Sequence, residues 1–436
     1  METVIRSETE MKESGASWMG KIPCEWSVSK LKWYLRRIDP RNPGDKQVLS
    51  LYREYGVIPK DSRDDNHNAT SEDTSKYKYV RVGDFVVNKM KAWQGSVAVS
   101  EYDGIVSPAY YVYHFTDDSY HRRYFHYLLR SCYKEEFMRL SGGIRVGQWD
   151  LNSKDLDNVL IVIPKKEEQQ AIADYLDEIC SKIDEIIAEA KASIDEYENL
   201  RQSIIYEILT KGPDDNVEMK DSGVEWIGKV PSHWMIGKVK YGTTKVGSGK
   251  TPKGGAEVYM TSGVMFLRSQ NIYNDGLRLD NPYYISEEID EEMKNTRVQK
   301  NDVLLNITGG SIGRCCIFDG SIQNANVNQH VCIIRVNSSV FLPEYMHLFW
   351  ISLIGQISIK SYQTGGNREG MSAEAIKNTP IPIIPIGEQR RIVDLIKPKI
   401  DDFNSLIAEK ESLINDLEAY KKSLIYEVVT GKRRVV

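Results

Sequence analysis

"MKESGASWMGKIPCEWSVSKLK", residues 11–32, occurs a second time in the chain as "MKDSGVEWIGKVPSHWMIGKVK", residues 219–240. Eleven of the 22 positions are identical, and the two copies start 208 residues apart. A match of this length within one chain indicates an internal repeat, in which each copy builds the same structural unit. The repeat therefore sets how the 436 residues are organised.

A second matched pair lies further along each half. Residues 168–210, beginning "EQQAIADYLDEI", match residues 388–430, beginning "EQRRIVDLIKPK", at 14 of 43 positions. Between the pairs the halves diverge, although "VGDFVVNKMKAWQGS" still lines up with "KNDVLLNITGGSIGR" and "RLSGGIRVGQWD" with "SYQTGGNREGMS". We therefore predict two diverged domains, each followed by a similar segment. The expected boundaries are 1–164 and 213–385 for the diverged domains, and 165–212 and 386–436 for the similar segments.

The similar segments carry the spacing of long amphipathic helices. Apolar residues recur every three or four positions with charged residues between them, which is typical of coiled-coil helices. We expect each long helix to run for about 30 residues, or ~45 Å at 1.5 Å per residue. Pro398 should interrupt the second one, because proline removes a backbone donor and clashes with the preceding turn.

Because the two helical segments match along their whole length, we expect them to pair with each other as an antiparallel coiled coil. Such a pair would hold the diverged domains at opposite ends of a rod, in a pseudo-twofold arrangement. The alternative is that each helix packs only on its own domain. The residues expected to pair are Ile183, Ile186, Ile194, Tyr197 and Ile204 of the first helix and Phe403, Ile407, Ile414, Leu417 and Leu424 of the second.

The diverged domains have the patterns of mixed α and β structure. "DFVVNKM", "SVAVS" and "SPAYYVYHF" are rich in Val and Tyr and predict strands, as do "DVLLNIT", "CCIF" and "HVCIIRV" in the second half. Residues 121–140 and 343–362 predict matching helices. The expected fold class is α+β: two tandem mixed domains separated by two long helices.

Composition restricts the class of protein further. The chain is 41% hydrophobic and 27% charged with a net charge of −5, which is ordinary for a globular protein, and no apolar run is long enough to cross a bilayer. The first residues lack the apolar core of a secretion signal, and the six cysteines have no CxxC spacing. These features predict a cytoplasmic protein with no metal site. The net charge leaves room for a local basic surface, since residues 238–253 hold five Lys and no acid.

Motifs for catalysis are incomplete. "VGSGKTPKGG" (246–255) lacks the first glycine of a phosphate-binding loop, where Thr244 stands, and Pro252 follows where the helix should begin. "DNPYY" (280–284) resembles the loop of amino-methyltransferases, but Tyr283 replaces its second proline, and no glycine-rich loop predicts an S-adenosylmethionine pocket. No nuclease or hydrolase constellation stands out either. The pattern is that of a binding protein without a reaction centre.

Loops with glycine, hydroxyl, amide and basic side chains recur at matching places in both halves. Freed backbone amides, hydroxyls and guanidinium groups suit phosphate contact, while Gln, Asn and Arg can read base edges. The alternative for each loop is an ordinary solvated turn. The candidate nucleic-acid contacts are Arg36, Arg41, Lys89, Lys91, Trp93, Gln94, Ser96, Arg145 and Gln148 in the first half, and Lys250, Thr251, Lys253, Arg268, Gln270, Asn271, Thr308, Ser311, Arg314, Asn367 and Arg368 in the second.

Over nearly its full length the chain resembles the specificity subunit of type I restriction–modification systems. The resemblance rests on "SGASWMGKIPCEW" and "SGVEWIGKVPSHW", on "VLLNITGGSIGRCCIF", and on "IPKKEEQQAIADYLD" and "IPIGEQRRIVDLI". It implies that each diverged domain is a target-recognition domain for one half of a split, asymmetric double-stranded DNA sequence, with the paired helices as spacer. It also implies docking of two modification subunits for adenine methylation, and of restriction subunits for cleavage. S-adenosylmethionine, ATP and Mg would then belong to those partners, and this chain would bind no cofactor. The second half is 12 residues longer between landmarks, so its loops are not simply those of the first.

Two other functions remain open at this point. One is a two-headed coiled-coil scaffold that binds sugars or proteins without DNA specificity, and the other is an autonomous methyltransferase. If binding stays the same when the loop arginines are replaced by alanine, the first function is favoured. If the chain alone transfers methyl groups, the second is favoured. The interpretation we favour is a non-catalytic DNA-recognition subunit.

Overall fold

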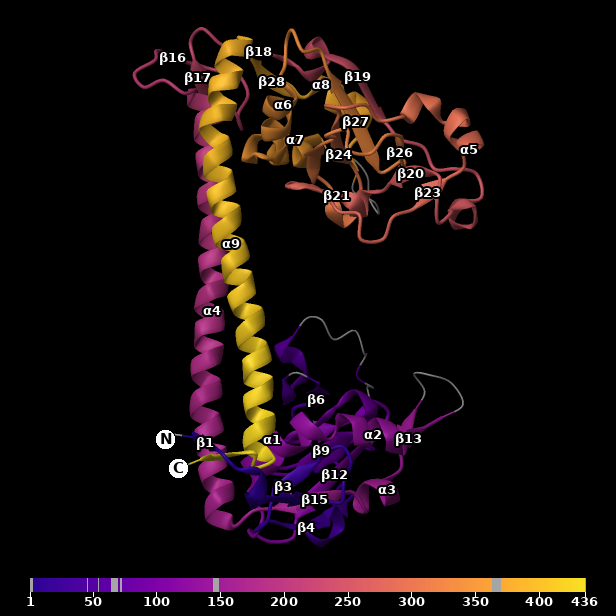
Figure 1. The fold of residues 1–436 in the computed structure, drawn as a ribbon, viewed down its shortest axis with the longest axis vertical. Helices are drawn as coiled ribbons and strands as arrows, with labels where there is room; N and C mark the ends of the chain where they lie inside the picture. The colour runs from indigo at the N-terminus through magenta and orange to yellow at the C-terminus, as the bar shows by residue number, and fades with distance from the viewer. Residues whose placement is uncertain are drawn as a thin grey trace. The chain divides into compact units, whose positions relative to one another are not determined.

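The computed structural model describes residues 3–44, 46–53, 55–63, 70, 73–143, 149–362 and 370–435. Contacts within the chain divide it into two compact units (Figure 1). Unit 1 consists of Met1–Ala190 with Glu411–Val436, and unit 2 consists of Lys191–Lys410. Each unit has its own large hydrophobic core, as the internal repeat predicts.

The same four-stranded antiparallel sheet lies at the centre of each unit. In both sheets the first strand in sequence pairs with the fourth, the fourth with the second, and the second with the third. These strands are β5 (Leu35–Ile38), β9 (Phe85–Asn88), β10 (Val97–Val99) and β12 (Tyr110–Phe115) in unit 1, and β19 (Thr243–Ser248), β24 (Val303–Asn306), β25 (Cys315–Ile317) and β27 (Val331–Val336) in unit 2. The strands expected from the sequence are confirmed as β9, β10, β12, β24, β25 and β27, whereas β5 and β19 were not predicted.

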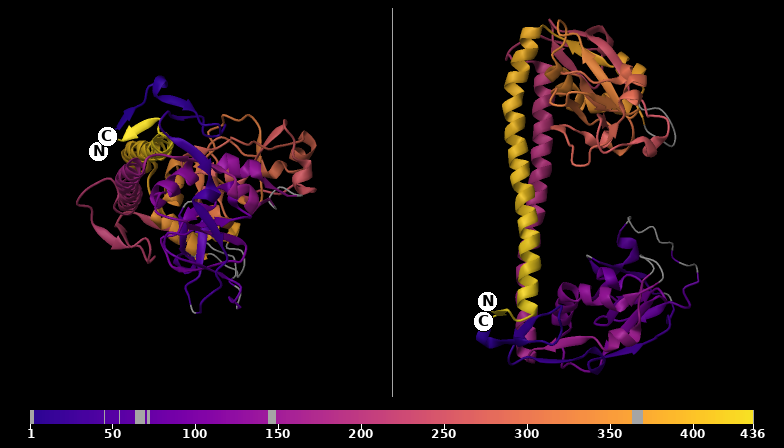
Figure 2. Two further views of the ribbon diagram at one scale, coloured as in Figure 1. Left: turned by 90° about the horizontal axis from the view of Figure 1, so that it is seen from below. Right: turned by 45° about the vertical axis from the view of Figure 1, so that its right-hand side comes forward.

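Helices cover one face of each sheet. They are α1 (Arg122–Cys132) and α2 (Lys134–Leu140) in unit 1, and α6 (Pro343–Ile351) and α7 (Leu353–Tyr362) in unit 2 (Figures 1 and 2). The prediction of one continuous helix in each half is wrong, because Tyr133 and Ser352 divide them. Tyr133 is fully buried and its hydroxyl donates to the Leu160 carbonyl at 2.8 Å, while the Ser352 hydroxyl donates back to Phe349 at 2.6 Å.

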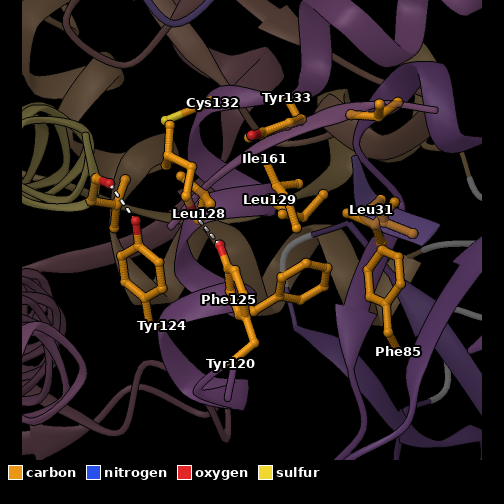
Figure 3. Packing of buried hydrophobic residues seen from close by; sticks show 14 of the residues in the cluster. Leu31, Phe85, Tyr120, Tyr124, Phe125, Leu128, Leu129, Cys132, Tyr133 and Ile161 are labelled. Atoms are coloured by element: carbon orange, nitrogen blue, oxygen red, sulfur yellow. Dashed lines mark hydrogen bonds between the residues drawn. The ribbon is translucent and has the colours of Figure 1, made fainter. Parts of the chain in front are cut away.

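Aromatic side chains fill the space between the unit 1 sheet and its helices. Figure 3 shows Tyr120, Tyr124, Phe125 and Phe85 in this core, where the rings of Phe125 and Phe85 meet edge to face with centres 5.0 Å apart. The Tyr124 hydroxyl donates to the Val429 carbonyl at 3.0 Å, and the Tyr120 hydroxyl donates to Val162 at 2.6 Å. Each buried hydroxyl thus has an acceptor, which removes the cost of taking it out of water.

Short strands cover the other face of each sheet. They are β6 (Leu49–Tyr52), β7 (Gly56–Pro59), β8 (Lys78–Val80) and β11 (Gly104–Val106) in unit 1, and β20 (Val264–Leu267), β21 (Ile272–Tyr273), β22 (Gly276–Leu277), β23 (Tyr284–Ile285) and β26 (Ala325–Val327) in unit 2, where α5 (Glu287–Glu292) is added. Side chains alternate between the two faces of a strand. Val303 and Leu305 of β24 accordingly enter the helix-side core, whereas Leu304 enters the strand-side core.

The repeated opening motif packs against the start of each long helix. Its hairpins are β2 (Met11–Glu13) with β3 (Lys21–Pro23), and β16 (Met219–Asp221) with β17 (Lys229–Pro231). Trp26 and Trp234, which follow them, are buried, and their indole N–H groups donate to Glu168 at 2.8 Å and Glu388 at 2.9 Å. The two most similar parts of the repeat are therefore in contact with each other in both units.

Two further paired elements complete the repeated framework. In each unit the strand that follows the opening motif pairs with the strand that precedes the long helix. A short helix comes just before this second strand. These elements are β4 (Ser27–Lys30) with β15 (Leu160–Ile163), β18 (Met235–Lys238) with β28 (Pro380–Ile383), α3 (Ser153–Asp157) and α8 (Ala373–Asn378).

Both long helices contribute to both units. They are α4 (Lys166–Lys211, 46 residues) and α9 (Ile386–Val429, 44 residues). Each is longer than the sequence predicted, because it extends beyond the seam, the row of regularly spaced apolar residues along which the two helices pack. In unit 1, Arg6 bonds both Glu168 and Gly431, and Lys421 pairs with Asp184 at 2.6 Å. These contacts require an antiparallel pair, as expected.

In unit 2 the pair is antiparallel as well. The rings of Tyr197 and Phe403 lie 6.4 Å apart, and Arg391 pairs with Asp214, just beyond α4, at 2.7 Å. Higher numbers on one helix therefore lie beside lower numbers on the other. The seam residues here are only half-buried, because a pair of helices encloses its seam less than a full core does.

One predicted seam residue is misplaced. Ile186 is 44% exposed, whereas Ile183 and Ile187 are buried. The seam advances by four and then by three residues, so it skips position 186. Of the other predicted residues, Ile414 and Leu424 are buried, and Ile194, Tyr197, Ile204, Phe403, Ile407 and Leu417 are half-buried.

Pro398 lies inside α9 and does not end it, contrary to the sequence prediction. Proline at this position costs the bond that would reach the carbonyl of Asp394, four residues back. Both residues are exposed, so water can hydrate that carbonyl. Ile392 and Ile396 are fully buried in the core of unit 2 and hold the helix on the opposite face. Tertiary packing thus outweighs the local preference.

Candidate nucleic-acid interface

Three loops of unit 2 leave the same edge of its sheet. β19 ends at Ser248, β24 ends at Asn306 and β27 begins at Val331. The register sets Ser248 opposite Cys332 and Asn306 opposite Val331. The loops that follow or precede these residues therefore start side by side, although they come from distant parts of the sequence.

Asn306 ties two of these loops together. Its side-chain amide donates to the Ser269 carbonyl at 2.8 Å and to the Ser311 hydroxyl at 3.1 Å. Its own Oδ1 is buried and accepts no hydrogen bond within the described residues. Asn306 therefore holds the loop after β24 against the segment after β20.

The segment after β20 forms a short turn around Asn271. Asn271 is buried, accepts a hydrogen bond from the Arg268 N–H at 2.9 Å and donates to the Arg278 carbonyl at 2.8 Å. Its amide, which the sequence predicted to contact DNA, is used here to hold the turn. Gln270 is exposed, and the Arg268 guanidinium lies 3.5 Å from the ring centre of Tyr283.

The loop after β24 presents three half-buried polar residues. Thr308 hydrogen-bonds Nδ1 of His330 at 2.5 Å, and Ser311 accepts from Asn306. The Arg314 guanidinium lies 4.6 Å from the ring centre of Tyr273, in the β21–β22 hairpin. The structure thus gathers the predicted residues of both segments at one edge of the sheet.

The lysine-rich loop begins later than the sequence suggested. Val246 and Ser248 belong to β19, so only the residues from Gly249 onward form the expected loop. A Cβ on Gly249 would lie 2.1 Å from the Val327 carbonyl, so only glycine allows this close approach of the backbone. Lys250 and Lys253 are exposed and Thr251 is half-buried.

In unit 1 the corresponding edge carries the loop after β9. Lys89 donates to Asp150 at 2.7 Å, and this hydrogen bond raises the pKa of Lys89. The rings of Trp93 and Trp149 meet edge to face with centres 5.6 Å apart. The cation expected to contact DNA is therefore already paired with an acid in this conformation.

The remaining residues of that loop differ in access. Lys91 is exposed and Gln94 is half-buried, so both stay available. Ser96 is only 3% exposed, so this predicted contact presents little surface. Ser96 directly precedes β10, whose three residues are all buried in the core.

Arg36 and Arg41 lie apart from that loop. Arg36 stands opposite His114 in β12, and the His114 ring forms a hydrogen bond with buried Asp84 at 2.8 Å. Asp84 directly precedes β9, so this group lies at the end of β9 opposite Asn88. These residues line a cleft of about 760 Å³. Arg41 is exposed and makes an isolated bridge to Lys78.

Four predicted contacts, Arg145, Gln148, Asn367 and Arg368, lie outside the described residues. Other residues at the edges were missed by the sequence reasoning: Trp149, Asp150, Tyr273 and Tyr283. Tyr273 and Tyr283 each follow an arginine-containing segment, so an interleaved Arg and Tyr pattern was the available signal.

The edges offer donors, cations and rings for contact with a polyanion or its bases. Within the described ranges, no three His, Cys, Asp or Glu side chains gather where they could hold a metal ion. Nor is any helix in this part of the chain both long and apolar enough to cross a membrane.

Comparisons with known proteins agree with this architecture. The model of the type I restriction modification DNA specificity domain matches residues 38–196 and 232–416. The EcoBI type I restriction enzyme specificity subunit of Escherichia coli is 23% identical over 330 residues, which cover 72% of this chain and 66%, just under two thirds, of that protein. The MjaX specificity subunit proposed in Methanocaldococcus jannaschii is 24% identical over 444 residues, covering 96% of both.

A solved structure shares the fold. It is a chain from work on complex assembly and conformational transition of the type I R-M system, with a TM-score of 0.68 at 15% identity, covering 94% of this chain and 99% of that one. At this identity the likeness concerns the fold alone, but the two domain matches cover more than half of the sequence. The chain therefore belongs to the type I restriction–modification DNA specificity family, as a specificity subunit with two such domains.

Proposed function

We propose that the chain recognises a bipartite, asymmetric DNA target, with one half-site bound by each recognition domain. The recognition domains would be residues 1–164 and 213–385, and residues 165–212 and 386–436 would form the spacer between them. In this role the chain is not itself an enzyme. It selects the sequence on which its partners act.

One observation carries the proposal: the same sheet occurs twice, and the same edge of each copy bears polar loops of different sequence. A single scaffold repeated with one set of loops would suit a palindromic target. Two different sets suit two different half-sites, because base edges are read by the particular side chains that reach them.

The contact surface is proposed to consist of the predicted residues that keep access. Asn271 and Ser96 are removed from it for the reasons given above. The residues retained are Arg36, Arg41, Lys89, Lys91, Trp93, Gln94, Lys250, Thr251, Lys253, Arg268, Gln270, Thr308, Ser311 and Arg314, with Arg145, Gln148, Asn367 and Arg368 as predictions from sequence alone.

The partners follow from the family. We propose that two modification subunits dock on this chain for adenine methylation, and that restriction subunits join them for DNA cleavage. S-adenosylmethionine, ATP and Mg would be bound by those subunits, in the cytoplasm. The names of the relatives as type I restriction enzyme subunits support this assignment.

The decisive test is to assemble the chain with its modification subunits and map the adenines that the complex methylates. The expected result is a motif of two short blocks separated by a fixed gap, with a footprint in two matching parts. One contiguous block would contradict the two-domain model. As a control, the chain alone should transfer no methyl group, and transfer without partners would establish an autonomous methyltransferase instead.

A further inference from the structure

Two arginines at the interface edge of unit 2 have no acidic partner among the residues that the structure describes. Arg268 and Arg314 form no ion pair with any described residue. Neighbouring arginines of the same unit do, with distances of 2.6–2.9 Å: Arg278 with Asp275, Arg297 with Asp290, Arg335 with Asp302, and Arg391 with Asp214. Arg268 and Arg314 are also half-buried, so water reaches their guanidinium groups only in part.

Tyrosine rings hold both groups in place. Arg268 lies 3.5 Å from the ring centre of Tyr283, and Arg314 lies 4.6 Å from that of Tyr273. A guanidinium stacked on a ring keeps its plane fixed while its N–H donors stay free for another partner. The stacking therefore positions each group without using its hydrogen-bonding capacity.

At least one of those donors is unsatisfied. Nε of Arg268 is buried and makes no hydrogen bond to any described residue. A buried donor without an acceptor is costly, and a native structure tolerates it where strain, a functional role or a bound water or ion accounts for it.

The framework keeps the two arginines close to the same edge. Asn306 bonds Ser269, next to Arg268, and Ser311, three residues before Arg314. The β21–β22 hairpin that carries Tyr273 contacts β24 and β25 (Figure 1). Both arginines are thus carried by short segments fixed to the sheet.

From this geometry we infer that Arg268 and Arg314 read guanine bases in the half-site bound by unit 2. Guanine presents two acceptors, O6 and N7, in one plane in the major groove, and a guanidinium can donate to both. Phosphates are contacted instead by exposed Lys250 and Lys253, whose flexible ammonium groups need no fixed plane. The inference rests on the proposed DNA-recognition function and goes beyond it by assigning base contacts to two residues.

The test uses the complex with modification subunits and duplexes that carry the target found from its methylated adenines. Each guanine is replaced in turn by 7-deazaguanine, which lacks the N7 acceptor. For the wild type, affinity should fall roughly tenfold at one or two guanines of one half-site only. In Arg268→Ala and Arg314→Ala complexes, which lack the donor, the replacement at the corresponding guanine should have no further effect.

Arg278→Gln is the matched control. Arg278 stacks on the same Tyr273 ring at 4.5 Å, but its guanidinium is paired with Asp275 at 2.9 Å. This variant should keep full sensitivity to 7-deazaguanine, and unfolding curves of all variants should show that unit 2 is intact. Guanidinium loss alone is then separated from loss of the surrounding structure.

Two results would overturn the inference. If neither half-site is sensitive to 7-deazaguanine, or if both alanine variants keep the wild-type sensitivity, the arginines do not read guanine. If Arg268→Ala and Arg314→Ala weaken binding equally for all sequences and lower its salt dependence, they contact phosphates instead. A complex that shows no sequence-specific methylation at all would refute the proposed function itself, which is a different outcome.

Discussion

The two units share their framework and differ at their edges. In both, a buried tryptophan donates to a glutamate at the start of a long helix, Glu168 or Glu388, and the next residue, Gln169 or Gln389, donates to a carbonyl before that helix, at 2.9 and 3.0 Å. At the edges, by contrast, unit 1 has a lysine paired with an acid and two packed tryptophans, while unit 2 has arginines that stack on tyrosines and pair with no acid in the described part of the chain.

This difference shows which parts of the repeat are constrained. The framework contacts join segments that are distant in sequence, so a change on one side must be matched on the other. The edge loops contact mainly each other and solvent, and can change without disturbing the core. The framework can therefore be held constant while the loops take up different binding chemistry.

The largest expected effect comes from the shared tryptophans. Trp26→Ala and Trp234→Ala should each lower the free energy of unfolding by about 3–5 kcal/mol, because each removes a buried ring and leaves a glutamate without its donor. Urea unfolding measures this, and Trp33→Ala, whose ring is 66% exposed, serves as the control. A large loss in one unit only would show that the two frameworks are not equivalent.

The long helices differ at one matched position, where α9 has Pro398 and α4 has Glu178. Pro398→Ala should raise the free energy of unfolding by about 2–3 kcal/mol, since it restores a backbone donor inside the helix. Glu178→Pro should act in the opposite direction. Denaturant unfolding with helix content followed by circular dichroism gives both values, and an unchanged midpoint for Pro398→Ala would mean that α9 bears no penalty at this residue.

Each unit also has a half-buried histidine in its first sheet-covering helix, His126 in α1 and His347 in α6. Burial, reinforced by Arg130 and Arg123, lowers the pKa of His126 to about 3, and burial also lowers the pKa of His347. His126 is therefore neutral in the folded state while the unfolded chain takes up a proton below its ordinary value of 6.5.

The contribution of neutral His126 to the free energy of unfolding is at its full value above pH 6.5. It is lost as the pH falls from 6.5 towards 3, because the unfolded chain then binds a proton that folded His126 does not. The loss should be about 2 kcal/mol at pH 5, at 1.36 kcal/mol for each pH unit. In His126→Gln the unfolding free energy should depend less on pH over this interval, as measured by urea unfolding between pH 5 and 7. Hydrogen exchange resolved by unit would assign the change, and equal slopes in wild type and variant would contradict it.

The smallest expected effect concerns the lysines at the two edges. Lys250→Ala should weaken DNA binding by the assembled complex a few-fold and reduce its dependence on log salt by about 0.9, the value for one phosphate contact. Lys89→Ala should have a smaller effect on both the affinity and its salt dependence, because Lys89 is already paired with Asp150. Titrations at several salt concentrations compare the two, and a larger effect of Lys89 would show that its ion pair opens on binding.

Much of the framework is predictable because it follows from short-range patterns and from the repeat. The strands, the antiparallel helix pairing and the tandem organisation all come from spacing and internal similarity. The continuation of α9 through Pro398 is not predictable in this way, since it depends on Ile392 and Ile396 being buried by partners elsewhere in the chain.

The candidate site is predictable only in outline. Loop position and residue type point to the correct edge, because equivalent loops follow equivalent strands. They do not distinguish Ser96 and Asn271, which are buried, from exposed Gln270. Nor do they show that Lys89 has an acid beside it, because Asp150 lies 61 residues away in sequence.

The way the long helices are shared has a consequence for synthesis on the ribosome. The buried core of unit 2 draws on residues from Ile205 to Ile396, whereas that of unit 1 includes Leu424, Val428 and Val429 as well as residues near the amino end. Unit 2 is thus an insertion within unit 1. The amino-terminal half must remain incomplete, with apolar surface uncovered, until translation has passed residue 429, and closing so long a loop slows folding. The part made first is the part finished last.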